Sequence, residues 1–160
     1  MAQNIFVAMP FKHSFDPVLD LIKDAANLLN AQAARLDEEP ISGSIVSHIR
    51  SQIEQSDLMV AVVSEENGNV YYEIGLAHCQ KKPVVLLTAD PTTLKFDLRD
   101  HRAIVYDAQS PKTVRDELVR TIKAALDGPS EPALFIESAF QRPTENELSY
   151  FSRLWHDGCG

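Results

Sequence analysis

The residues with the clearest chemical potential lie in the run NGNVYYEIGLAH, residues 67–78. Its Asn-Gly-Asn turn predicts the start of a helix, with Glu73 in the first turn. At about 100° per residue, Glu73 falls between Leu76 and Ala77 on the apolar side of that helix. A carboxylate held toward the core can stabilise or attack a positive charge that develops on a substrate. A first-turn acid that only complements the helix dipole is the simpler alternative, and position alone leaves both open.

The neighbours of Glu73 could bind a ligand, although each has a structural alternative. Asn67 and Asn69 suit sugar hydroxyls, because an amide both donates and accepts hydrogen bonds. Turn formation and helix capping explain the same two residues. Tyr71 and Tyr72 lie about 100° apart around the helix, so the two rings cannot both face the ligand. The predicted binding set takes Asn67, Asn69 and Tyr72 from this run.

Further candidates lie where other strands end or helices begin. Asp37 could hydrogen-bond a ribose hydroxyl or be an exposed loop acid. Ser44, in the segment Ser-Gly-Ser, could help to hold a phosphate at a helix N-terminus or simply cap the helix. Phe11 could stack on a base or pack in the core. Arg99 could meet a ligand phosphate or pair with a neighbouring aspartate.

Metal, redox and serine-hydrolase chemistry find no support in the motifs. The five histidines show no metal-ligand spacing with the two cysteines, Cys79 and Cys159. The chain has no Gly-rich phosphate loop, no Gly-x-Ser-x-Gly elbow and no Cys-x-x-Cys pair. We therefore predict neither a metal site nor a bound cofactor.

The elements that must position these residues alternate between strand and helix. Apolar runs predict strands at residues 4–9, 35–37, 58–63, 83–87 and 103–106. Helical spacing predicts helices over residues 16–34, 45–56, 67–82 and 112–126. This alternation predicts an α/β fold with a flavodoxin-like, doubly wound, five-stranded parallel sheet in the order 2-1-3-4-5. The loops near residues 9–11 and 64–72 would then share one crevice at the switch point of the sheet.

The chain divides into two parts at residue 126. Residues 1–126 are expected to form the α/β domain, and residues 127–160 a linker and an amphipathic C-terminal helix. Leu148, Phe151 and Trp155 share one face of that predicted helix and need a partner surface. The helix could dock on its own domain, mediate dimerisation or begin a further domain.

Composition sets broad limits on partners and location. The 160 residues carry a net charge of −8, which opposes binding to a nucleic acid polymer. No apolar stretch approaches the roughly 20 residues that span a bilayer, and no signal peptide is predicted. Two cysteines are too few for a disulfide framework and fit a reducing compartment. We therefore expect a cytoplasmic protein that contacts no membrane.

Seven segments in order resemble the nucleoside 2-deoxyribosyltransferase-like and bacterial TIR-like proteins: IFVAMPF, RLDE, SGSI, DLMVAVV, NGNVYYEIGLAH, KPVV and FDLR. They cover roughly residues 4–107, and the resemblance implies a flavodoxin-like architecture there. It also implies a glutamate, matched by Glu73, that attacks or stabilises the anomeric carbon of a ribosyl group. Met9, in the first-strand motif, stands where the transferases usually carry glycine. The loop after the third strand has Ser64 and asparagines where they tend to place aspartates.

The resemblance implies an N-ribosyl hydrolase or transferase that cleaves the N-glycosidic bond of a nucleoside, nucleotide or NAD-like molecule. The alternatives are a non-catalytic nucleotide-sensing module and a structural partner domain. Related enzymes often complete their pockets from a neighbouring subunit, so a homo-oligomer is implied. From its residues, we expect Glu73 to be ionised at neutral pH, because a first-turn position favours the anion while apolar neighbours oppose it.

Overall fold

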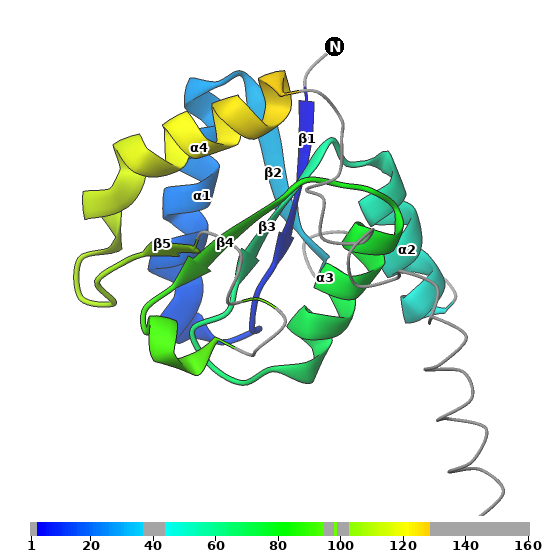
Figure 1. Ribbon diagram of the computed structural model, residues 1–160, viewed down its shortest axis with the longest axis horizontal. Coiled ribbons are helices and arrows are strands. Elements are labelled where there is room, and N and C mark those ends of the chain that lie inside the picture. The colour runs from blue at the N-terminus through cyan, green and yellow to red at the C-terminus, as the bar shows by residue number, and fades with distance from the viewer. Residues whose placement is uncertain (1–2, 37–43, 95–97, 99–102, 129–160) are drawn as a thin grey trace, which may run out of the picture.

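A five-stranded parallel sheet organises the chain (Figure 1). The computed structural model describes residues 3–36, 44–94, 98 and 103–128. The strands, in the spatial order β2-β1-β3-β4-β5, are β1 (Gln3–Ala8), β2 (Ala31–Arg35), β3 (Leu58–Val62), β4 (Val84–Thr88) and β5 (Ala103–Val105). All four pairings are parallel. The predicted flavodoxin-like sheet and its order are therefore confirmed.

Helices cover both faces of this sheet. On one face lie α1 (Asp16–Leu28) and α4 (Arg115–Asp127), and on the other lie α2 (Ile45–Gln55) and α3 (Gly68–Cys79) (Figure 1). Short 3-10 turns occur at η1 (His13–Phe15), η3 (Pro91–Thr93) and η5 (Pro111–Val114). Side chains alternate along β1, with Val7 in the cluster beneath α1 and α4 and Ala8 in the cluster beneath α2 and α3. Strand β3 is buried throughout, as its unbroken apolar run predicts.

The first helix is shorter than predicted, and the second strand begins earlier. Helix α1 ends at Leu28, and Asn30 follows with φ of 55°, in the left-handed region that asparagine tolerates. Strand β2 then covers residues 31–35 instead of 35–37. The sequence AQAAR has high helix propensity. Pairing with β1, from Gln3↔Ala31 to Val7↔Arg35, nevertheless holds it extended.

Helix α3 corrects one expectation about Glu73 and confirms another. The helix begins at Gly68 with Asn67 as its N-cap, so Glu73 lies in the second turn, and the first turn carries no acid. The alternative in which Glu73 complements the dipole from the first turn is therefore wrong. The predicted orientation is right, because Glu73 is buried on the side of α3 that also carries Val70, Ile74 and Ala77.

The last described elements end close to the predicted boundary. The predicted helix over 112–126 is a 3-10 turn followed by α4, which ends at Asp127. The predicted C-terminal helix with Leu148, Phe151 and Trp155 lies outside the described residues. None of the helices in the described ranges has the length and apolar character needed to cross a bilayer.

Candidate functional site at the carboxyl ends of the strands

Asn67 fixes the start of the helix that carries Glu73. Its side-chain oxygen accepts hydrogen bonds from the backbone N–H groups of Asn69, at 3.0 Å, and Val70, at 3.4 Å. These two groups have no acceptor within the helix, so the cap satisfies them. The capping alternative is therefore confirmed for Asn67. Asn69 is exposed and contributes its backbone to the same cap.

Burial dominates the electrostatics of Glu73. The residue is 6% exposed, and desolvation raises the pKa of its carboxyl from 4.5 to about 7. Among the described residues, no hydrogen bond or ion pair reaches this carboxyl to offset the desolvation. In the second turn, the helix dipole gives an anion little support, because its effect falls off within the first turn. The expectation that Glu73 is an anion at neutral pH is therefore corrected, because burial brings the pKa of its carboxyl to about 7.

Two alanines face the helix that carries Glu73. Ala8 of β1 and Ala61 of β3 are partners in register, and both belong to the buried cluster beneath α2 and α3. Helix α3 packs on β1, β3 and β4. Methyl side chains at this pair leave more space under α3 than larger apolar groups would.

Polar contacts bring together the loops that the topology predicted to be neighbours. The Lys12 ammonium, after β1, lies 2.7 Å from a carboxylate oxygen of Glu65, after β3. In the same loop, Ser64 Oγ lies 2.7 Å from the Tyr106 hydroxyl and accepts the backbone N–H of Ala89 at 2.9 Å. The segment leading into α3 is therefore tied to the ends of β1, β4 and β5. Burial raises the pKa of Tyr106, which keeps its hydroxyl protonated for this contact.

Phe11 presents an open aromatic ring at the same end of the sheet. The side chain is 55% exposed, so the core-packing alternative is wrong. The guanidinium carbon of Arg35, at the end of β2, lies 5.3 Å from the centre of the ring. This is a cation–π distance. Sequence reasoning missed Arg35, because the second strand was predicted at residues 35–37, which put Arg35 at its start instead of its end.

Met9 and Ser44 occupy different surroundings from Glu73. Met9 is 3% exposed and packs in the cluster beneath α1 and α4, on the opposite face of the sheet from α3. Ser44 is the exposed N-cap residue of α2, but its side chain makes no capping hydrogen bond. Its hydroxyl is therefore open to solvent at a helix N-terminus, and side-chain capping does not account for Ser44.

The two tyrosines, Tyr71 and Tyr72, lie on different sides of α3, as the helical wheel predicts. Tyr72 is 49% exposed on the outer side of α3. Tyr71 is half-buried, and its hydroxyl is buried without a hydrogen-bond partner. The inward residue is thus Tyr71, whereas the predicted binding set contains Tyr72. Two further members of that set, Asp37 and Arg99, lie outside the described residues.

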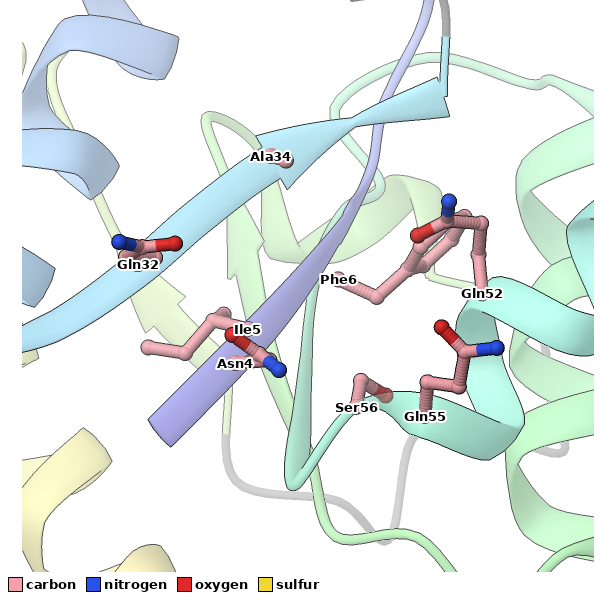
Figure 2. Close-up of a pocket in the computed structure, with 8 residues that line it drawn as sticks. All are labelled: Asn4, Ile5, Phe6, Gln32, Ala34, Gln52, Gln55 and Ser56. Atoms are coloured by element: carbon pink, nitrogen blue, oxygen red, sulfur yellow. The ribbon is translucent and has the colours of Figure 1, made fainter. Parts of the chain in front are cut away.

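A hollow of about 180 Å³ lies elsewhere, beside the amino ends of the strands (Figure 2). Its lining residues come from β1, β2 and the end of α2: Asn4, Ile5, Phe6, Gln32, Ala34, Gln52, Gln55 and Ser56. Helix α3 contributes none of these. We place the candidate chemistry at Glu73 rather than in this hollow, because the hollow has no titratable side chain in its lining. No three potential metal ligands cluster anywhere within the described ranges.

Comparison with known proteins yields a distant structural likeness. No family model and no curated protein matches the chain. The chain is similar to the TIR domains in the structure of the activated Roq1 resistosome directly recognising the pathogen effector XopQ. The identity is 18% and the TM-score 0.49, with 98% of this chain and 99% of that chain covered. This likeness is too distant to identify a family or a function.

Proposed function

We propose that the protein is an N-ribosyl hydrolase or transferase that cleaves the N-glycosidic bond of a nucleoside, nucleotide or NAD-like molecule. Glu73 is the proposed catalytic residue. The observation that supports this role is a glutamate only 6% exposed, with no hydrogen bond or ion pair to any described residue. Burying a carboxyl group without a partner destabilises a fold, so packing alone gives no reason for its presence.

The reaction requires a carboxylate opposite the leaving base. As the C–N bond breaks, its electron pair leaves with the base, and positive charge develops on the sugar. A neutral nucleobase takes up a proton as it leaves, whereas the cationic nicotinamide ring of an NAD-like molecule leaves as a neutral base without one. The Glu73 carboxylate stabilises this charge or forms a bond to the anomeric carbon. Water or an acceptor then forms the new bond to that carbon and releases a proton. A substrate with positive charge near Glu73 would also lower the pKa of its carboxyl.

We propose that the substrate binds at the carboxyl ends of the strands. Phe11 provides an exposed ring on which a base can stack, and Ser44 and Asn69 provide exposed polar groups. The other proposed contacts rest on the sequence: Asp37, Asn67, Tyr72 and Arg99. Met9 also belongs to the predicted set, but its side chain is 3% exposed and packs beneath α1 and α4, on the opposite face of the sheet from α3. The side-chain oxygen of Asn67 already accepts the capping hydrogen bonds, so its amide N–H groups are the part that can donate to a substrate.

A nucleotide-sensing module without turnover is the second candidate function. The pKa of about 7 supports it, because a large fraction of Glu73 is neutral and unreactive at neutral pH. The loop leading into α3 also has Asn67 and Asn69 where the resembling transferases tend to have aspartates. A sensor would bind the same ligands and change its stability instead of releasing a base.

Base release by purified protein tests the catalytic proposal. The protein is incubated with a panel of nucleosides, nucleotides and NAD, and free base is followed by chromatography. We expect release by the wild type and by Glu54→Gln, a matched change of an exposed glutamate on α2. We expect a loss of at least about 100-fold in Glu73→Gln, as for removal of a nucleophile. Release that survives in Glu73→Gln contradicts the mechanism, and thermal stabilisation by one ligand without release supports the sensor.

We further propose that the protein forms a homo-oligomer, binds a small molecule as its main partner and acts in the cytoplasm. The two cysteines, too few for a disulfide framework, support this location. Static light scattering on the full chain tests the oligomer, and a mass equal to one chain at all concentrations contradicts it.

A further inference from the structure

We infer that the hollow beside the amino ends of β1 and β2 is a second ligand site, which takes a neutral planar heterocycle such as a free nucleobase. The inference rests on the side chains that line the hollow and does not depend on Glu73. All of the lining residues come from β1, β2 and the end of α2 (Figure 2). None comes from the loops at the carboxyl ends, where the proposed glycosidic chemistry takes place.

The polar lining consists of neutral groups that both donate and accept hydrogen bonds. Four side-chain amides and one hydroxyl contribute, and no charged side chain lines the hollow: Asn4, Gln32, Gln52, Gln55 and Ser56. Each side-chain amide offers two N–H donors and one oxygen acceptor. This pattern complements the mixed donor and acceptor edge of a nucleobase. It offers no charge to hold a phosphate and no carboxylate to hold a divalent cation.

Two of the amides stand side by side on a fixed backbone. Asn4 and Gln32 are register partners of adjacent parallel strands, so their side chains leave the sheet on the same face. No described residue forms a hydrogen bond with either side-chain amide. The backbone of Asn4 is held by Asp57, whose carboxylate accepts its N–H at 2.8 Å and whose N–H donates to its carbonyl at 2.8 Å. A ligand therefore meets available amides without moving the strands.

The opposite wall is fixed by bonds at the end of α2. Ser56 Oγ donates to the carbonyl of Ile53 at 2.8 Å, and the Lys82 ammonium donates to the carbonyl of Ser56 at 2.6 Å. These bonds satisfy backbone carbonyl groups at the end of α2, and they direct the ammonium group of Lys82 toward backbone oxygens. Gln55 donates through Nε2 to Ser51 Oγ at 3.1 Å, which leaves its amide oxygen to accept. The backbone of both polar walls is thus held in place by hydrogen bonds in the absence of a ligand.

Size and apolar surface limit the ligand to a single ring system. The apolar residues of the lining are Ile5, Phe6 and Ala34, and Phe6 is 4% exposed. The volume of about 180 Å³ is below the range of about 300–1,000 Å³ that holds drug-sized molecules. A base fits these limits better than a whole nucleotide does. The site would thus bind a product-sized fragment of the substrate class proposed for Glu73.

Nuclear magnetic resonance on the full-length protein tests the site directly. Protein labelled with ¹⁵N is titrated with adenine, cytosine, uracil and nicotinamide, with benzoate as an anionic ring of similar size. We expect at least one neutral probe to shift the side-chain amide signals of Asn4 and Gln32 and the backbone signals of residues 52–56. Benzoate should leave these signals in place. If no neutral probe shifts them up to its solubility limit, the inference is wrong.

Matched variants separate this site from surface binding in general. Gln32→Leu removes one amide from an exposed strand position, and we expect it to weaken probe binding about tenfold or more. Gln109→Leu removes an exposed amide after β5, at the other edge of the sheet, and should leave binding unchanged. Equal binding by Gln32→Leu and wild type, or shifts confined to Phe11 and Glu73, overturns the inference. Neither result alters the base-release assay.

Discussion

At the scale of single residues, Glu73 combines burial with an ionisable group. Burial raises the pKa of its carboxyl from 4.5 to about 7. Since one pKa unit corresponds to about 1.4 kcal/mol, the difference corresponds to roughly 3 kcal/mol of free energy. The folded protein bears this cost only when the carboxyl is ionised. A ligand with positive charge offers a reason for an otherwise unfavourable arrangement.

The stability of the protein should depend on pH through Glu73. Because its pKa is raised in the folded state, the unfolded chain loses the proton first as pH rises from about 4.5 to 7, and the free energy of unfolding falls over that window. Glu73→Gln removes the charge. We expect it to match the wild type near pH 4 and to exceed it by up to about 3 kcal/mol near pH 8. Urea unfolding at both pH values measures the difference.

The control for this experiment is Glu54→Gln, which alters an exposed glutamate on α2. Its difference from the wild type should stay within about 0.5 kcal/mol at both pH values. If Glu73→Gln is less stable than the wild type near pH 8, the carboxylate has a stabilising partner and burial is not its main influence.

The same titration should govern base release. If ionised Glu73 meets the anomeric carbon, kcat/KM should rise with pH and reach half of its plateau near the pKa of about 7 in the free protein. Initial rates between about pH 5 and pH 9 measure the profile. A rate that falls through this range instead would assign Glu73 the role of a proton donor.

At the scale of elements, the N-cap of α3 positions Glu73. We expect Asn67→Ala to lower the free energy of unfolding by about 1 kcal/mol, because the N–H groups of Asn69 and Val70 lose their acceptor. Asn67→Asp retains an acceptor and should stay close to the wild type. Chemical unfolding of the three proteins gives the comparison. Equal stability of Asn67→Ala and wild type would mean that water replaces the cap at little cost.

Strand β2 shows how pairing overrides local preference. Residues 31–35 favour a helix by composition, and only Asn30, with φ of 55°, marks the end of α1. Pairing with β1 brings the end of β2 beside the first loop, so that Arg35 reaches the ring of Phe11. The contact that sequence reasoning missed thus follows from a strand boundary that it placed too late.

At the scale of the whole molecule, one serine joins three strands. Ser64 after β3 accepts the N–H of Ala89 after β4 and bonds to the hydroxyl of Tyr106 after β5. Ser64→Ala leaves both groups without this partner, and we expect it to destabilise the protein by about 1–3 kcal/mol. Tyr106→Phe removes one bond while Ser64 keeps the other, so about 1 kcal/mol is expected. Thermal and urea unfolding measure the loss of stability in both variants, which we expect to be larger for Ser64→Ala. A larger loss for Tyr106→Phe contradicts this expectation.

The sequence alone determined the sheet and the side of α3 on which Glu73 lies. An apolar run such as residues 58–63 favours a strand covered on both faces, and the alternation of strands and helices favours a doubly wound order. The helical wheel placed Glu73 among buried residues because periodicity follows from local backbone geometry. These features depend on neighbours in the chain.

The tertiary structure decided the solvent exposure and the neighbours of the ionisable and aromatic side chains. The raised pKa of Glu73 depends on water excluded by other elements, which no local pattern records. The position of Arg35 beside Phe11 and the side-by-side amides of Asn4 and Gln32 depend on the register of β2 against β1. Register is set by pairing between segments far apart in sequence, and a shift of one residue in β2 would turn Gln32 and Arg35 to the other face.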